Sequence, residues 1–225
     1  MPLRVVTISA SFGAGGSRVG PALAERLGLP LIDRAIPAAV AESLAVPLSR
    51  AMAHDERSQS ALGRILAKMA SAVPYGAGPA VSPDMIEDPD MFRARTEVIM
   101  RRVADTTGGV VIGRAGAIVL AGYPGAFHVR LDGPRDRRLA RAVTHESVAA
   151  AEAAKLLDDS DRAREAYVRH FYRCDPRDPR HYHLVIDSTM APIDTCVEII
   201  LVAAEASFAA ERPADGAPAA GQPAG

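Results

Sequence analysis

The sequence predicts a three-layer α/β domain in which a parallel sheet of about five strands is covered by helices on both faces. Short β-branched runs such as Val5-Val6-Thr7-Ile8 are continuously apolar, as is typical of strands buried on both faces. Stretches with apolar residues at helical spacing separate these runs, which favours parallel pairing. The chain has 225 residues, 48% hydrophobic and 24% charged, and can therefore bury the core of one domain.

The first predicted strand covers residues 5–8 and leads through a glycine-rich turn into a helix that ends at Gly28. Residues 29–32 are predicted to form a second short strand, and residues 36–44 a second helix. The stripe that predicts the first helix consists of Val19, Leu23 and Leu27. A strand, a glycine turn and a helix thus open the domain.

Residues 45–90 show no strand pattern and are expected to form a helical insertion. A helix is predicted near residues 58–71 and a loop over residues 74–79, where glycine and proline cluster. The next helix is expected to bury one face, formed by Phe92, Ile99 and Val103.

Three more strands are predicted over residues 109–113, 127–131 and 184–187. An arginine-rich helix over residues 134–143 and a charged helix over residues 147–173 lie between the last two strands. The final helix carries an apolar stripe, formed by Ile193, Val197, Ile200 and Leu201. The domain is expected to cover residues 1–208, followed by a disordered tail rich in alanine, glycine and proline at 209–225.

Composition also predicts the setting and the partners. No run of 18 apolar residues occurs, and Cys174 and Cys196 are too few to staple a secreted fold, so we expect a cytoplasmic protein without a membrane span. The net charge of −1 argues against general affinity for nucleic acid. All but two of the 26 basic residues are arginine, whose planar fork suits phosphate oxygens, although a GC-rich genome would also favour arginine codons.

The turn over residues 9–18 joins a buried strand to a helix N-terminus, where main-chain N–H groups and the helix dipole attract anions. Pro21 lacks an N–H group and is expected to lie within the first helical turn, so the helix should begin near Gly16 or Ser17. Ser17 would then be placed to reach a magnesium ion on bound phosphates.

Several interpretations compete for this turn. A dinucleotide fingerprint fails because Arg18 stands where the third glycine belongs, and no Tyr-x-x-x-Lys pair supports a short-chain dehydrogenase. A P-loop fits the glycines and Ser17, but Gly16 replaces its lysine. A purely structural turn remains the alternative.

Two other kinds of site have little support. Histidine, cysteine and aspartate gather near residues 170–183, but their spacing matches no recognised metal site. The sequence also lacks the Gly-x-Ser-x-Gly turn of many serine hydrolases.

Taken in order, residues 8–17, 29–34 and 111–114 resemble the cytidylate kinase-like family of P-loop proteins. The likeness continues through residues 127–131 and 182–189 and spans residues 4 to about 203. It implies a three-layer P-loop nucleoside-monophosphate kinase fold, ATP and Mg²⁺ as cofactors, and transfer of the ATP γ-phosphoryl group to CMP, dCMP or a related acceptor. The implied partners are small-molecule nucleotides.

The resemblance also implies residue roles. Gly13, Ala14, Gly15, Gly16, Ser17 and Arg18 would hold the donor phosphates, with Ser17 on Mg²⁺, and Asp33, Arg34 and Arg114 would face the acceptor. Arg138 and Arg141 would clamp the phosphates from a mobile lid within residues 132–180, and the catalytic residues would be Arg18, Arg114, Arg138 and Arg141. As alternatives, Asp33 could merely cap a helix, and the arginine helix could be a solvated face.

Three departures from the family pattern qualify these roles. Ala115 replaces the acid of the family's Gly-Arg-Asp segment, and residues 9–11 read Ser-Ala-Ser where the family has Ser-Arg-Glu. With the P-loop lysine also missing, Arg18 is the remaining local cation for a β- or γ-phosphate. A catalytically weak nucleotide-binding sensor or regulatory module is therefore the alternative function.

Overall fold

The computed structural model describes residues 4–32, 89–113, 115–145 and 150–210. A five-stranded parallel sheet in the order β2-β3-β1-β4-β5 forms its centre. The strands are β1 (Val5–Ala10), β2 (Leu31–Ile32), β3 (Gly109–Ile112), β4 (Ala126–Asp132) and β5 (Leu184–Asp187). These strands confirm the five predicted from the apolar runs, with shifts of one or two residues at their ends.

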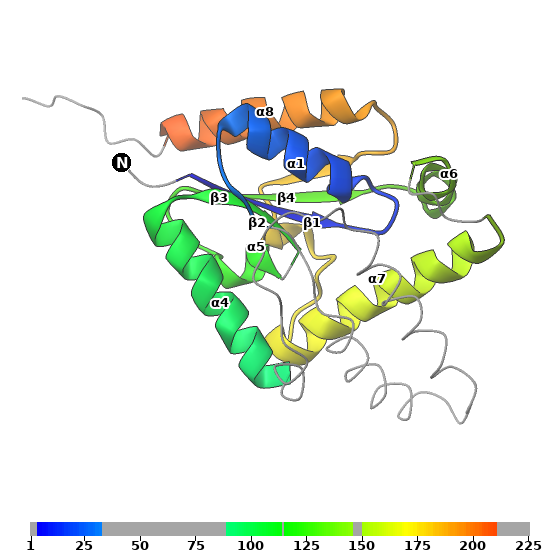
Figure 1. Cartoon of the computed structure of the whole chain (residues 1–225), viewed down its shortest axis with the longest axis horizontal. Helices are drawn as coiled ribbons and strands as arrows, with labels where there is room; N and C mark the ends of the chain where they lie inside the picture. Colours follow the sequence, from blue (N-terminus) through cyan, green and yellow to red (C-terminus); the bar gives the residue numbers. More distant parts are fainter. Residues whose placement is uncertain (1–3, 33–88, 114, 146–149, 211–225) are drawn as a thin grey trace, which may run out of the picture.

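Helices lie on both sides of the sheet (Figure 1). One side carries α1 (Gly16–Leu27) and α8 (Ile193–Ala210), and the other carries α4 (Pro89–Thr106), α5 (Gly116–Val119) and α7 (Ala150–Tyr172). At the carboxyl ends of the strands lies α6 (Arg135–His145), and a short 3₁₀ helix, η2 (Pro179–His181), precedes β5. The three-layer α/β prediction is confirmed.

The core lies on both faces of the sheet because alternate residues of each buried strand point to opposite sides. On β1, Val6 and Ile8 pack in one cluster with residues of α1 and α8, such as Leu23 and Ile200. Val5, on the opposite face, packs in a second cluster with Met100 and Ala104 of α4. Strands packed on both faces carry mostly apolar residues, which explains the apolar runs of β1 and β3.

The first helix begins at Gly16, as the sequence predicts, and ends at the left-handed Gly28. The predicted position of Pro21 within the first helical turn is wrong. Pro21 lies in the second turn rather than the first, where its missing N–H group leaves the Ser17 carbonyl without the usual intrahelical donor.

The predicted buried face of α4 differs from the observed one. Ile99 is 49% exposed, whereas Met100 is 1% exposed and Ala104 is fully buried. Val103 is half-buried, and its Cγ1 would lie 3.2 Å from a Cβ atom on Gly109 of β3, so of the described side chains the prediction is wrong at Ile99. Met100 and Ala104, four residues apart, form the stripe of α4 that faces the sheet.

This packing predicts losses of stability of different size for two adjacent substitutions. Met100→Ala is expected to lower the free energy of unfolding by roughly 2–5 kcal/mol, since it leaves a cavity. Ile99→Ala, at a half-exposed position, should change it by less than about 1 kcal/mol. Urea unfolding of both variants tests the prediction, and equal losses would contradict the observed packing of α4.

Several predicted segments lie outside the described residues. They include the helices over residues 36–44 and 58–71, nearly all of the insertion at 45–90, and the tail beyond residue 210. Ala209 and Ala210, assigned to the tail, instead belong to α8. Within the described ranges, no helix is both long and apolar enough to cross a membrane.

His128 is a polar side chain buried within β4, with 3% of its surface exposed. Its Nδ1 lies 2.8 Å from the Thr7 hydroxyl, and its ring stacks on His183 at a centroid distance of 4.8 Å. Burial, with a smaller contribution from the charge of His183, lowers the pKa of His128 to about 4. The folded protein therefore holds this imidazole neutral.

The lowered pKa of His128 predicts acid-sensitive stability. Between the ordinary histidine pKa and the folded value of about 4, the unfolded chain binds a proton that the folded chain does not. Stability should therefore be complete above pH ~6.5 and should fall by up to roughly 3 kcal/mol as the pH approaches 4. Urea unfolding between pH ~6.5 and ~4 tests this prediction. His128→Asn should make the free energy of unfolding less dependent on pH in this range. An unchanged pH dependence in this variant would assign the effect to other groups.

Candidate functional site

The glycine turn lies at the carboxyl end of β1, in the middle of the sheet. Chain connections from β1 run toward β2 and β3 on one side, whereas β4 and β5 lie on the other. Open α/β sheets bind ligands at such a reversal of strand order, outside the carboxyl ends of the strands. In Figure 1 this edge lies on the right, beside α6.

The turn adopts a backbone conformation that gathers its N–H groups. Gly13 has φ 74° and Gly15, the residue that caps α1, has φ 80°. Ala14, between them, has a negative φ. Among the described residues other than glycine, positive φ values occur only at Ala115 and Arg173. Alternating signs of φ turn successive main-chain N–H groups toward one concave side, a conformation that binds anions.

Four amides of this turn donate to no acceptor among the described residues: those of Gly13, Gly15, Gly16 and Ser17. The others are used internally. The Phe12 amide donates to the Asp161 carboxylate at 2.7 Å, the Ala14 amide to the Ser11 carbonyl at 3.1 Å and the Arg18 amide to the Gly15 carbonyl at 3.0 Å. Bonded and unbonded amides therefore alternate from Phe12 to Gly15, and the first two amides of α1 donate to no described acceptor.

Carbonyl groups of the same turn are bonded by side chains from distant elements. Arg138, on α6, donates to the Phe12 carbonyl at 2.8 Å, and the Ser188 hydroxyl donates to the Ala14 carbonyl at 2.7 Å. Both side chains are buried. Because peptide C=O and N–H groups point in opposite directions, these donors keep the carbonyls away from the concave side.

Arg138 and Arg141 lie at the site but bond to the backbone. Arg138 is 8% exposed, and its guanidinium is shared between the Phe12 and Gly133 carbonyls and Asp161. Arg141 donates to the carbonyls of Ser188 and Ala191. A Cβ atom on Gly15 would lie 3.7 Å from Arg141 Nη1, so this guanidinium lies beside the turn. The arginine helix is therefore not simply a solvated basic face.

A second buried arginine, on β4, contacts the start of the turn. Arg130, on β4, donates to Asp132 at 2.7 Å and to the Ser11 hydroxyl at 3.1 Å. Burial alone would raise the pKa of Asp132, but the hydrogen bond and the charge of Arg130 outweigh it and lower the pKa below its ordinary value. Asp132 thus stays ionised beside two arginines, since Arg138 Nε also lies 3.6 Å from its carboxylate.

The remaining predicted site residues divide into two groups. Ser17 is partly buried at the first turn of α1, and Arg18 is exposed. Asp33, Arg34 and Arg114, assigned to the acceptor, lie outside the described residues. Asp161 lies within the predicted lid region 132–180, and Ser188 lies within the family-like run 182–189. Local spacing does not predict their contacts with the turn, because their partners lie 149 and 174 positions earlier in the chain.

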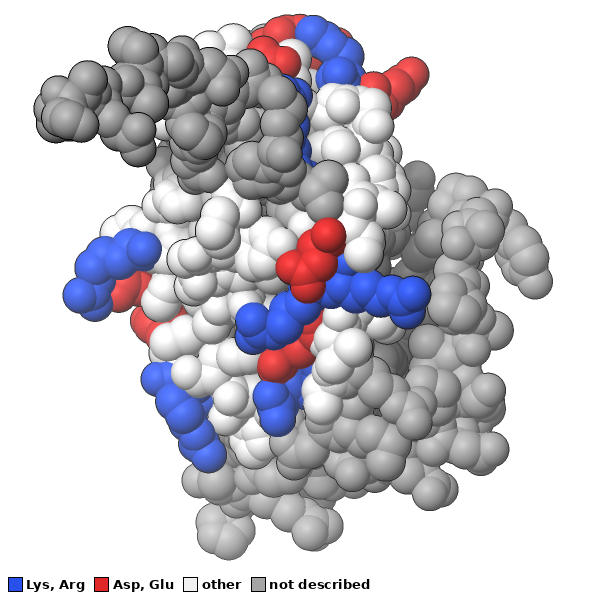
Figure 2. All heavy atoms as spheres, turned by 90° about the vertical axis from the view of Figure 1, so that its left-hand side faces the viewer, with Lys and Arg blue, Asp and Glu red and all other residues white. Residues whose placement is uncertain are grey.

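Among the described residues, no three potential metal-binding side chains lie close enough together to hold a metal ion, and this applies also to residues 170–183. Figure 2 shows the end of the molecule opposite α6, where the described surface carries scattered charges of both signs.

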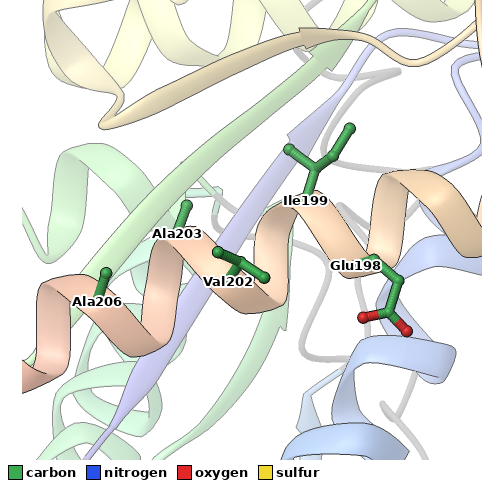
Figure 3. A pocket seen from close by; sticks show the side chains of 5 residues that line it. All are labelled: Glu198, Ile199, Val202, Ala203 and Ala206. Carbon is green, nitrogen blue, oxygen red and sulfur yellow. The ribbon is translucent and has the colours of Figure 1, made fainter.

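An open, shallow apolar groove of about 430 Å³ follows the outer side of α8, lined by Glu198, Ile199, Val202, Ala203 and Ala206 (Figure 3). Glu198 points toward α1, where it pairs with Arg26 at 2.6 Å. The groove therefore offers hydrocarbon surface rather than groups that bind phosphate.

Comparison with known proteins identifies relatives of the whole domain. The model of the cytidylate kinase-like family matches residues 5–190. A uronate isomerase from Corynebacterium glutamicum is 28% identical over 144 residues, which cover 64% of this chain and 27% of that protein. The matched region thus spans about a quarter of that relative.

Solved structures show the same fold at low identity. An uncharacterized protein from Eubacterium ventriosum has a TM-score of 0.61 at 19% identity, over 90% of this chain and 98% of that chain. A gluconokinase from Sinorhizobium meliloti has a TM-score of 0.52 at 19% identity, over 93% and 95% of the two chains. Together with the sheet order, these likenesses confirm the predicted P-loop kinase fold.

Proposed function

The chain belongs to the cytidylate kinase-like family, and from this premise we propose that it transfers the γ-phosphoryl group of ATP to CMP, dCMP or a related nucleoside monophosphate. The observation that carries the proposal is the set of four amides that donate to no acceptor among the described residues, in a turn of alternating φ at the N-terminus of α1. Such a turn offers several N–H donors and the positive end of a helix dipole to one phosphate chain.

In this proposal, the residues from Gly13 to Arg18 hold the donor phosphates. Arg141 lies beside Gly15 and has N–H donors beyond the two that it gives to the carbonyls of Ser188 and Ala191. Arg18 takes the place of the missing lysine. Asp33, Arg34 and Arg114 are proposed for the acceptor. Because the attacking group is already an anionic phosphate oxygen, these residues need to position and neutralise charge rather than remove a proton.

Magnesium fits the donor set at the start of α1. Mg²⁺ bound to a nucleotide takes most of its ligands from phosphates and waters, so one protein hydroxyl suffices. Ser17, partly buried in the first helical turn, supplies that hydroxyl. When bound, the ion would neutralise charge on the β- and γ-phosphates.

A second candidate function is nucleotide binding without turnover, as in a sensor or regulatory module. Two observations favour it: Gly16 stands where a P-loop has its lysine, and Arg138 is engaged with backbone carbonyls rather than exposed. Loss of one positioned charge costs roughly 3 kcal/mol of transition-state stabilisation, enough to slow transfer while binding persists.

A coupled assay with ATP, Mg²⁺ and each of CMP, dCMP, UMP and AMP separates the two candidates when nucleotide-induced thermal shifts are measured alongside. Transfer that Arg18→Ala abolishes supports the kinase. Stabilisation by ATP without transfer to any acceptor supports the binding module. Arg26→Ala removes an exposed arginine from the far end of the same helix and should change neither readout. Absence of both binding and transfer would contradict both functions.

A further inference from the structure

Two ion pairs connect α6 with α7, and each joins an arginine to an aspartate 23 residues later. Arg135 pairs with Asp158 through two hydrogen bonds of 2.9 and 2.6 Å. Arg138 pairs with Asp161 at 2.6 Å. The two pairs lie one helical turn apart and connect the same two helices, but their surroundings differ.

The Arg135–Asp158 pair is exposed, with about half of each side chain accessible to solvent. The Arg138 side chain is 10% exposed and that of Asp161 is 21% exposed. A salt bridge on the surface contributes little to stability, whereas a buried one fixes geometry and leaves a costly unpaired charge when one partner is removed.

Both members of the buried pair also bond to the same residue of the glycine turn. The second oxygen of Asp161 accepts the Phe12 amide at 2.7 Å, and the guanidinium of Arg138 donates to the Phe12 carbonyl at 2.8 Å. The main chain of the residue preceding Gly13 is thereby held on both sides by one ion pair.

The side chain of Phe12 is held by the same two helices. It is 5% exposed and belongs to a cluster with Ala142 and Leu157, against which Leu139 and Leu156 pack. Phe12 therefore anchors the turn to α6 and α7 through its ring, its amide and its carbonyl. A displacement of these two helices would break all three contacts.

We propose that Asp161 and Arg138 are positioning residues, and that the contact of α6 and α7 with Phe12 controls the affinity of the glycine turn for phosphate. The inference rests on the proposed phosphate-binding function of the turn. By fixing the peptide groups on both sides of Phe12, the ion pair sets the direction in which the Gly13 amide and those after it point. Bound phosphate must in return strengthen the contact of α6 and α7 with the turn, because coupling between two sites is reciprocal.

The test measures the dissociation constant for ATP in the presence of Mg²⁺ by titration calorimetry. Asp161→Ala is expected to weaken binding at least tenfold, whereas Asp158→Ala, which cuts the equivalent exposed pair, should change it less than twofold. Asp161→Asn retains an oxygen for the Phe12 amide but loses the charge, and should give an intermediate value. Arg138→Lys keeps the charge but cannot reach its three acceptors together, and should weaken binding like Asp161→Ala.

Amide hydrogen exchange adds a readout that general destabilisation would not produce. In Asp161→Asn, exchange at Phe12 should accelerate more than exchange in the core strands β1 and β4. ATP should slow exchange in α6 and α7 of the native protein. Equal ATP affinities for the native protein, Asp161→Asn and Arg138→Lys would overturn the positioning role, even if Asp161→Ala does not fold. If the native protein itself does not bind ATP, the proposed function is wrong. This result differs from equal affinities of the native protein and its variants, which would contradict only the positioning role.

Discussion

Gly13→Ala is expected to abolish ATP binding and to lower the free energy of unfolding by roughly 2–5 kcal/mol. Two separate costs add. Gly13 has φ 74°, a conformation that costs a residue with a Cβ atom about 1–2 kcal/mol. The new Cβ would also overlap the backbone carbonyl of Arg138, so the turn and α6 must separate. This separation disrupts the contacts that orient the turn.

Gly122→Ala is the matched control for Gly13→Ala. Gly122 has a similar φ of 71°, but a Cβ there meets no atom within 4 Å. It should therefore show the conformational cost of about 1–2 kcal/mol alone and bind ATP normally. Urea unfolding and titration calorimetry on both variants separate strain from steric overlap. Normal ATP affinity in Gly13→Ala would contradict the close approach of α6 to the turn.

Asp132→Ala is expected to destabilise the protein by roughly 3–5 kcal/mol, because it leaves Arg130 as a buried cation without its carboxylate. The Arg130 side chain is 10% exposed. Without Asp132 it keeps the Ser11 hydroxyl, the Pro176 carbonyl and the Tyr182 ring, whose centroid lies 5.9 Å from the guanidinium carbon, but no carboxylate. Glu198→Ala cuts the Arg26 pair, in which both side chains are half-exposed, and should cost at most about 1 kcal/mol. Equal losses in the two variants would show that burial of the Arg130–Asp132 pair is energetically unimportant.

The same pair predicts the acid limit of stability. The pKa of Asp132 is lowered in the folded protein, so its contribution is complete above the ordinary carboxyl pKa and is lost as the pH falls through the lower folded value. This range lies below that of His128, whose effect should be nearly complete at pH ~4. In Asp132→Ala, the part of the acid-induced loss below pH ~4 should be smaller than in the native protein.

The buried strands and the start of α1 could be predicted from the sequence because local chemistry determines them. Val5-Val6-Thr7-Ile8 is apolar on both faces of its strand, and glycines precede the first helix. The buried face of α4 could not be predicted in full from the helical spacing of Phe92, Ile99 and Val103. Its orientation depends on packing against a sheet that forms from distant segments, and Met100 rather than Ile99 faces that sheet.

The glycine turn could also be identified from the sequence, but its supports could not. The family resemblance predicts that Arg138 clamps the phosphates together with Arg141, which shares its helix face. Helical spacing does not say what lies opposite that face. In the fold it faces Phe12, 126 positions earlier, and becomes a buried donor to backbone carbonyls. Residue spacing predicts which side chains share a helix face, whereas tertiary packing decides whether that face meets ligand or protein.

Titration of the ¹⁵N-labelled protein with inorganic pyrophosphate tests the central claim most directly. Because pyrophosphate has no base or sugar, its effects report on phosphate contacts alone. We predict that the largest saturable shifts occur at the amides of Gly13, Gly15, Gly16 and Ser17, the four that bond to no described acceptor. Saturable binding with the largest shifts elsewhere, or no change at these four amides in millimolar pyrophosphate, would contradict the assignment of this turn as the phosphate site.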